Sequence, residues 1–216
     1  MTARNPAPPL PHPQPPAAAG QALRDAAQGA AYAWARPTGP TGHARAVSQM
    51  YSVLRDLGIA ARGLARYQTA GTPPAPASPH FTPYLAASDR WLLDAWQHLD
   101  GVLAAEGLGT LPDDSEPGTV LCQAARNAIL AWRQPEGTAA DRDTTVEHLI
   151  TAIWFLAIGA LSLAAYAPRR RTIELRAVAN SLAEAAACLT RAIQGPAGDT
   201  EPGHNPDPAR HPDGRP

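Results

Sequence analysis

Lysine is missing from this chain, and its 18 basic residues other than histidine are all arginines. Alanine, by contrast, occurs 46 times. This bias is typical of a protein encoded by a high-GC bacterial genome, so it does not indicate that arginine was selected for bidentate chemistry. Cysteine is scarce: Cys122 and Cys188 lie far apart in apolar segments. We expect them to be reduced, buried thiols, with a disulfide between them as the less favoured alternative.

The chain also has no excess of positive charge, since its formal net charge is −1. This excludes a broad basic surface of the kind that binds nucleic acid. The sequence contains no glycine-rich phosphate loop, no Gly-x-Ser-x-Gly motif and no histidine spacing typical of a metal site, so we expect no cofactor and no metal. Asp94 and His98 are four residues apart, with Arg90 one turn earlier. Two ligands do not make a zinc site, and we interpret these residues as surface ion pairs.

Strand patterns are nearly absent, whereas the apolar spacing of helices is clear. The steps between apolar residues alternate between three and four from Val47 to Leu64 and again from Leu175 to Ala192. Such spacing is typical of bundle helices packed side by side. Helices are predicted at residues 17–35, 41–64, 82–106, 116–134, 144–167 and 172–193. We therefore predict an all-α bundle of five or six mostly antiparallel helices with a central apolar helix.

Proline dominates both ends of the chain. Residues 1–19 contain seven prolines and residues 195–216 contain six, among glycines and charged residues. Such segments bury too little apolar area to offset their chain entropy. We therefore predict a disordered tail at 1–19, a helical bundle domain at 20–194 and a second disordered tail at 195–216.

The segment 149–167 contains no charged residue. It is just long enough to cross a bilayer, and Arg169–Arg171 would hold its end in the cytoplasm. However, Met1–Gly20 has no hydrophobic segment of the kind found in export signals. A helix that is apolar all round also suits the centre of a bundle, with Thr144 and Glu147 at capping-box spacing before it. We favour a core helix in a cytoplasmic protein, and keep a single-span membrane protein anchored by 149–167 as an alternative.

An arginine and a histidine separated by five residues, Arg142 and His148, come just before this segment. The pair resembles the Arg-x-His motif of the HEPN superfamily, compact helical bundles that include metal-independent ribonucleases. The resemblance covers seven residues, and Asp143 supplies the polar residue that often follows the arginine. It implies that Arg142 stabilises phosphate charge and that His148 acts as acid or base. The alternative is that both are ordinary loop and helix residues.

Three consecutive arginines, Arg169, Arg170 and Arg171, precede the last predicted helix. Backbone N–H groups at a helix N-terminus attract anions, and guanidinium groups would add to that attraction. A phosphate, an acidic partner or a lipid headgroup could bind there, and a solvated turn is the alternative.

No motif identifies a reaction, so we expect a cytoplasmic, non-catalytic protein that acts through helix-mediated protein contacts. The partner is another protein or a second copy of this chain. The alternatives are the HEPN-like ribonuclease and the membrane-anchored protein.

Overall fold

A computed structural model describes residues 14–37, 39–69, 81–106 and 117–194. Residues 1–13 of the tail predicted at 1–19, and all of the tail predicted at 195–216, lie outside these residues. Within them, the chain forms six helices and two very short strands. These are α1 (Pro16–Trp34), α2 (Gly39–Leu64), β1 (Gln68–Thr69), α3 (Phe81–Glu106), α4 (Gly118–Ala131), β2 (Glu136–Gly137), α5 (Ala139–Tyr166) and α6 (Arg169–Gln194). The predicted all-α bundle is confirmed.

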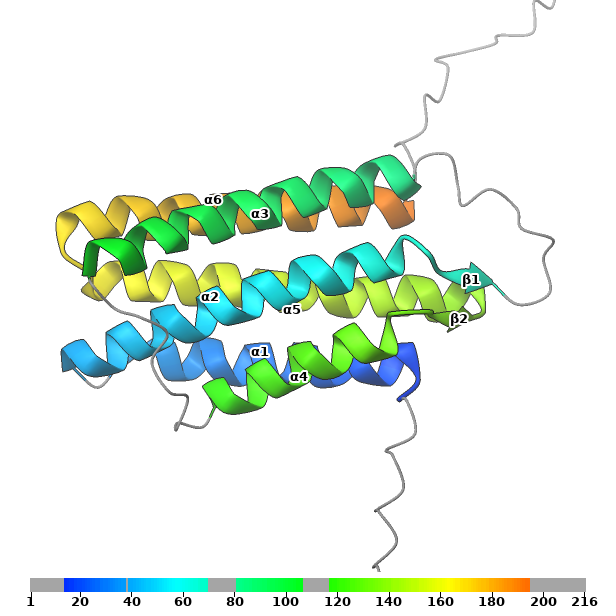
Figure 1. Ribbon diagram of the computed structural model, residues 1–216, viewed down its shortest axis with the longest axis horizontal. Helices are drawn as coiled ribbons and strands as arrows, with labels where there is room; N and C mark the ends of the chain where they lie inside the picture. The colour runs from blue at the N-terminus through cyan, green and yellow to red at the C-terminus, as the bar shows by residue number, and fades with distance from the viewer. Residues whose placement is uncertain (1–13, 38, 70–80, 107–116, 195–216) are drawn as a thin grey trace, which may run out of the picture.

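The helices lie in two layers (Figure 1). One layer holds α4, α2 and α3, and the other holds α1, α5 and α6. The chain direction reverses from each helix to the next, as the colours in Figure 1 show. The parallel pairing of β1 with β2 joins the end of α2 to the connection between α4 and α5. This arrangement places α5 in the middle of its own layer, with α1 and α6 beside it and α2 across the core.

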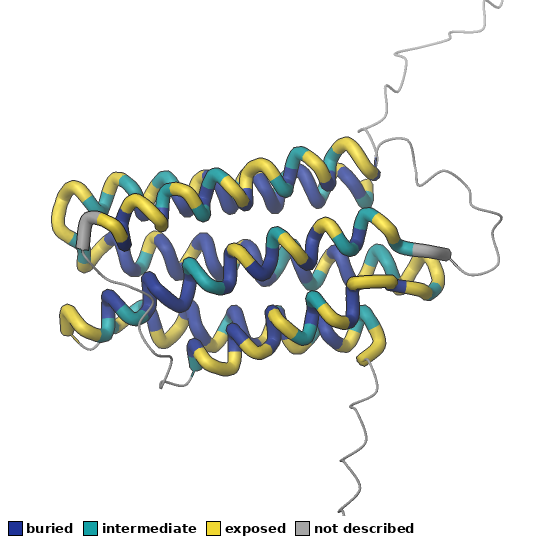
Figure 2. The backbone as a smooth tube through the Cα atoms, viewed as in Figure 1, coloured by how far each residue is buried: buried dark blue, intermediate teal, exposed yellow. Residues whose placement is uncertain are grey.

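The core between the layers is formed by the faces that the apolar spacing predicts (Figure 2). Leu54 and Leu57 on α2 and Leu182 and Leu189 on α6 are at most 1% exposed. Small residues set how closely the helices approach. At Gly159 of α5, an added Cβ would lie only 2.8 Å from the ring of Trp34 on α1. Both cysteines are buried and form no disulfide.

The predicted start of α5 is wrong. The helix begins at Ala139, and Thr138 is its N-cap. The Thr138 hydroxyl accepts a 3.1 Å hydrogen bond from the Asp141 backbone N–H, and the Asp141 carboxylate accepts a 2.8 Å bond from the Thr138 N–H. Thr144 and Glu147 have the same spacing but already lie inside the helix. Arg142, predicted to precede the helix, is therefore in its first turn.

Other boundaries shift by a few residues. The helix α1 begins at Pro16, so the predicted bundle domain starts four residues too late. Proline is tolerated in a first helical turn because its missing N–H has no partner there. The helix α6 begins at Arg169, not at Thr172, so the arginine triplet forms its first turn. The connection between α1 and α2 turns at Gly39, whose φ of 71° favours glycine.

The apolar helix α5 is buried on one side only. Of the described helices, it alone is long and apolar enough to cross a membrane, and half of its most apolar window is buried in the bundle. Its inward side carries Leu149, Ile153, Leu156 and Leu163, all fully buried. Its outward side, away from α2, remains exposed. The central helix predicted from the sequence is thus central within its layer and open on its outer face.

Candidate contact and binding surfaces

The structure places Arg142 and His148 on different sides of α5. Six residues advance an α-helix by about one and two-thirds turns, so side chains at this spacing diverge. The Arg142 guanidinium lies 4.7 Å from the ring centroid of Phe81, the first residue of α3. It also donates a 2.8 Å hydrogen bond to its neighbour Asp143. These contacts hold Arg142 against α3, and the two residues of the HEPN-like motif do not converge within one chain.

His148 faces α1. An added Cβ at Gly20 would lie 3.1 Å from the His148 Cβ, so glycine allows the histidine to pack against the α1 backbone. Burial in this position lowers the pKa of His148, and the nearby Arg24 guanidinium lowers it further. The imidazole is therefore held in its neutral form by packing against α1, away from Arg142.

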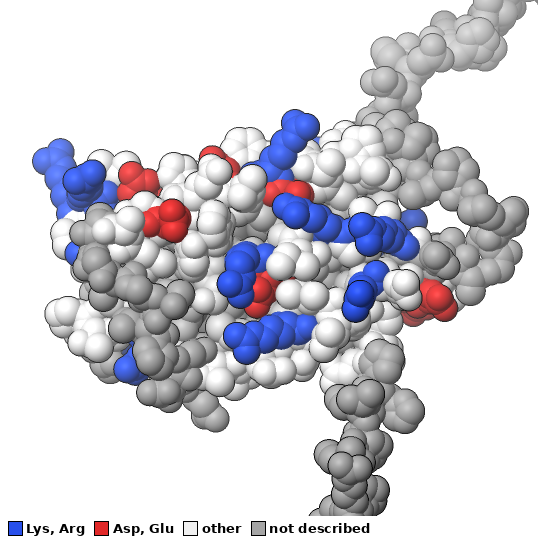
Figure 3. Space-filling model, viewed as in Figure 1, with Lys and Arg blue, Asp and Glu red and all other residues white. Residues whose placement is uncertain are grey.

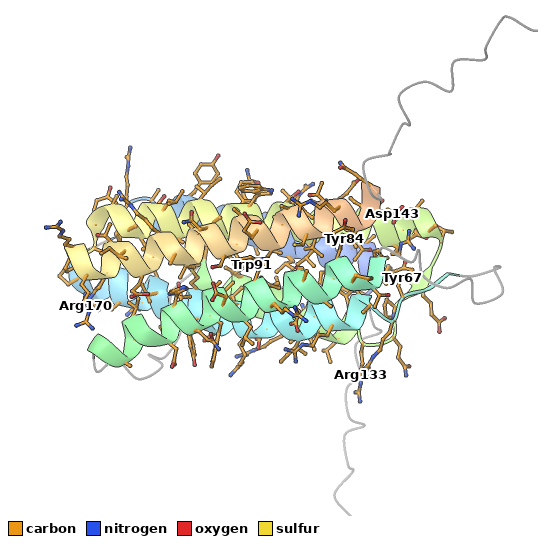
Figure 4. The ribbon with its side chains drawn as sticks, turned by 90° about the horizontal axis from the view of Figure 1, so that it is seen from above. Tyr67, Tyr84, Trp91, Arg133, Asp143 and Arg170 are labelled. Atoms are coloured by element: carbon orange, nitrogen blue, oxygen red, sulfur yellow. The ribbon has the colours of Figure 1, made fainter. Side chains whose placement is uncertain are left out.

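The arginine triplet lies at the end of the bundle where α5 turns into α6. Arg169 and Arg170 are exposed, and Arg170 projects away from the bundle (Figure 4). Arg171 is half-buried and lines a cavity of about 350 Å³ together with His43 and Tyr166. His43 is itself engaged, because its Nε2 donates to the Leu163 carbonyl at 3.0 Å. Of the three arginines, only Arg171 lines this cavity.

The sequence pair Asp94 and His98 belongs to a polar cluster between α3 and α6. His98 Nδ1 lies 2.8 Å from a Glu174 oxygen, and His98 Nε2 lies 3.7 Å from Asp94. The Ser181 hydroxyl donates a 2.6 Å hydrogen bond to Asp94. The serine thus points to the carboxylate and not to the imidazole, so no nucleophile and base are paired here. Asp94 and Glu174 contact different nitrogens of His98, and within the described residues no group of three or more such side chains could hold a metal ion.

The outward face of α5 carries a continuous apolar stripe. Trp154, Ile158 and Leu161 step by four and three residues, which places them on one side of the helix. Their exposed fractions run from 46% to 51%. Sequence reasoning missed this surface, because a helix that is apolar on every side has no periodicity that reveals its exposed face. We call these three residues the α5 stripe.

A second surface lies on the opposite layer, between the ends of α2 and α4. A cavity of about 380 Å³ lies among Arg62 on α2, Arg66 just after α2 and Arg133 just after α4. Figure 3 shows arginines gathered over α2, α3 and α4 on this face. Sequence reasoning missed this site too, since the two segments that form it are more than sixty residues apart. We call it the α2–α4 groove.

Comparison with known protein families, with curated proteins and with solved structures finds no match for this chain.

Proposed function

We propose that this protein is a cytoplasmic, non-catalytic helical bundle that acts by protein–protein contact, and that the α5 stripe joins two copies of the chain. The observation that carries the proposal is the exposure of Trp154, Ile158 and Leu161 on one helical face. Exposed apolar residues scattered singly are ordinary, whereas a contiguous patch marks an interaction surface.

The size of the α5 stripe suits a weak dimer. Three large side chains, each about half exposed, present roughly 300 Å² of surface. Two copies in contact would bury about twice that area, which is below the range of stable interfaces and typical of weak, transient ones. The dimer should therefore depend on protein concentration. Association through one helix of each copy also leaves the rest of the bundle unchanged.

The spacing of the α5 stripe supports a second copy as the partner. Trp154 precedes Ile158 by four residues, and Leu161 follows it by three. These side chains lie about 6 Å and about 4.5 Å from Ile158 along the axis at the helical rise per residue. A two-fold axis through Ile158 places Trp154 of one copy near Leu161 of the other. Each contact occurs twice, as an isologous interface requires.

Sedimentation equilibrium between about 5 and 200 μM tests the proposal, a range chosen for weak interfaces. We expect a reversible dimer for the wild type and a monomer for Ile158→Glu, because two carboxylates would meet at the axis. The matched control is Ile173→Glu, since Ile173 on α6 is also exposed but lies off the stripe. It should dimerise like the wild type.

A wild type that remains monomeric, or equal behaviour of the two isoleucine variants, refutes the proposal. Recovery of the protein only from detergent-solubilised membranes also refutes it and favours the membrane anchor.

A further inference from the structure

The α2–α4 groove exists because two helices approach unusually closely at one end of the bundle. At Gly63 of α2, an added Cβ would overlap the backbone carbonyl of Trp132, so only glycine allows this contact. Trp132 itself is fully buried, and its indole N–H donates a 3.0 Å hydrogen bond to the Pro16 carbonyl. The groove beside this contact is therefore set in a rigid part of the fold.

The floor of the groove is apolar and open to solvent. Leu130 is 66% exposed and Ile59 is 47% exposed, and the half-buried Ile129 lies with them in the lining. These side chains come from α2 and α4, so neither helix alone forms the floor. A cavity of about 380 Å³ is large enough for a small ligand but not for a protein domain.

The rim of the groove is cationic and not fully neutralised. Arg62 donates from Nε to both Asp89 oxygens at 2.9–3.0 Å. The guanidinium groups of Arg66 and Arg133 have no hydrogen bond or ion pair within the described part of the chain. Arg133 projects outward at this end of the bundle (Figure 4).

The surrounding face reinforces this charge. Arg55 and Arg126 lie on the same two helices and share one carboxylate, Asp56. Five arginines on this face therefore meet two carboxylates, Asp56 and Asp89, although the whole chain has a net charge of −1. Fixed cations beside an apolar surface attract an anion and increase its local concentration.

We propose that the α2–α4 groove binds a small organic anion, an aryl or acyl carboxylate, sulfonate or phosphate. Arg66 and Arg133 contact its charged group, and Ile59, Ile129 and Leu130 contact its apolar body. The guanidinium groups of Arg66 and Arg133, which pair with no described residue, select negative charge, while the exposed leucine and isoleucine favour an apolar body over a bare inorganic ion. The pocket volume restricts the ligand to a small molecule.

The probe for this site is 1-anilinonaphthalene-8-sulfonate, which combines an aromatic body with one negative charge and fluoresces when bound. We expect saturable binding to the wild type. Loss of one charge-assisted contact weakens binding about ten-fold, so Arg66→Gln with Arg133→Gln should raise the Kd about a hundred-fold. Leu130→Gln should also raise it.

The matched control replaces two exposed arginines on the other layer, Arg176→Gln with Arg191→Gln on α6. This variant has the same net charge as the groove variant and should bind like the wild type. N-phenyl-1-naphthylamine shares the aromatic body without the sulfonate, and its binding should be equal in both double variants. Circular dichroism melts confirm that all variants are folded.

Three results would overturn the proposal. One is equal binding of the sulfonate by the two double variants, which would show that these guanidinium groups do not contact it. The other is loss of binding in Ile158→Glu with retention in the groove variant, which would place the probe on the α5 stripe. Displacement of the probe by inorganic phosphate at similar concentration would also contradict the need for an apolar body.

Discussion

Replacing Leu54 by alanine should destabilise the bundle by about 2–3 kcal/mol. Leu54 lies on the inner face of α2 and is 1% exposed. Truncation to alanine removes three buried carbon atoms, which accounts for about 2 kcal/mol of lost transfer free energy. The cavity term is moderate here, because Leu54 already lines a small cavity of about 180 Å³ between α2 and α3. The space left can merge with this cavity and admit solvent.

The neighbouring Leu57 provides a sharper comparison. It is fully buried and does not line that cavity. Leu57→Ala should therefore cost more, about 3–5 kcal/mol, because the void that it leaves is closed on all sides. Leu93 on α3 is 45% exposed and serves as the leucine control, with an expected cost below about 1 kcal/mol.

Urea denaturation followed by circular dichroism measures these differences. With a slope of about 2 kcal/mol per molar urea, Leu54→Ala should lower the midpoint by about 1–1.5 M at unchanged slope. The expected order of midpoints is Leu93→Ala, then Leu54→Ala, then Leu57→Ala as the lowest. If Leu54→Ala and Leu93→Ala shared one midpoint, the inner face assigned to α2 would be wrong.

Two further predictions concern α5. Thr138→Ala should destabilise the protein by about 0.5–2 kcal/mol in the same urea assay, because both hydrogen bonds between the Thr138 hydroxyl and Asp141 are lost, while Thr144→Ala should have almost no effect. If Thr144→Ala were destabilising and Thr138→Ala were not, Thr144 would be the N-cap, as predicted from the sequence. The lowered pKa of His148 means that the unfolded chain binds a proton more readily than the folded chain. Stability from the neutral His148 is present above pH 6.5, near the pKa of an unfolded histidine, and decreases as the pH falls toward the lower folded pKa. His148→Gln should therefore lose less stability than the wild type between pH 7.5 and pH 5; equal losses would contradict this.

The sequence predicted the helices well because their evidence is local. The apolar steps through Leu54, Leu57 and Leu64 define one face of one helix, and each residue lies in the core as expected. Helix starts were less certain, because two Thr-x-x-acid patterns precede the apolar segment, at Thr138 and at Thr144. Spacing alone cannot choose between them. The structure uses the earlier one because the helix continues through the residues between them.

The candidate surfaces could not be predicted, because they depend on which segments meet in space. Arg66 and Arg133 are 67 residues apart, and nothing near either residue indicates the other. Conversely, Arg142 and His148 are near in sequence and diverge in the fold, since an α-helix separates residues at this spacing. Local sequence patterns predict individual helices. A site formed by several helices can be predicted only when the packing of those helices is known.

The outward faces of α5 and α6 show why the α5 stripe is not simply a product of apolar composition. The two helices lie side by side in one layer, and both present an outer side. On α6 the exposed residues include Arg176, Asn180 and Glu184, as expected where a helix faces water. On α5 the exposed residues from Trp154 to Leu161 include no charged side chain. The outer face of α6 thus carries charged side chains, whereas this part of the outer face of α5 carries none. We therefore infer that a partner covers the outer face of α5.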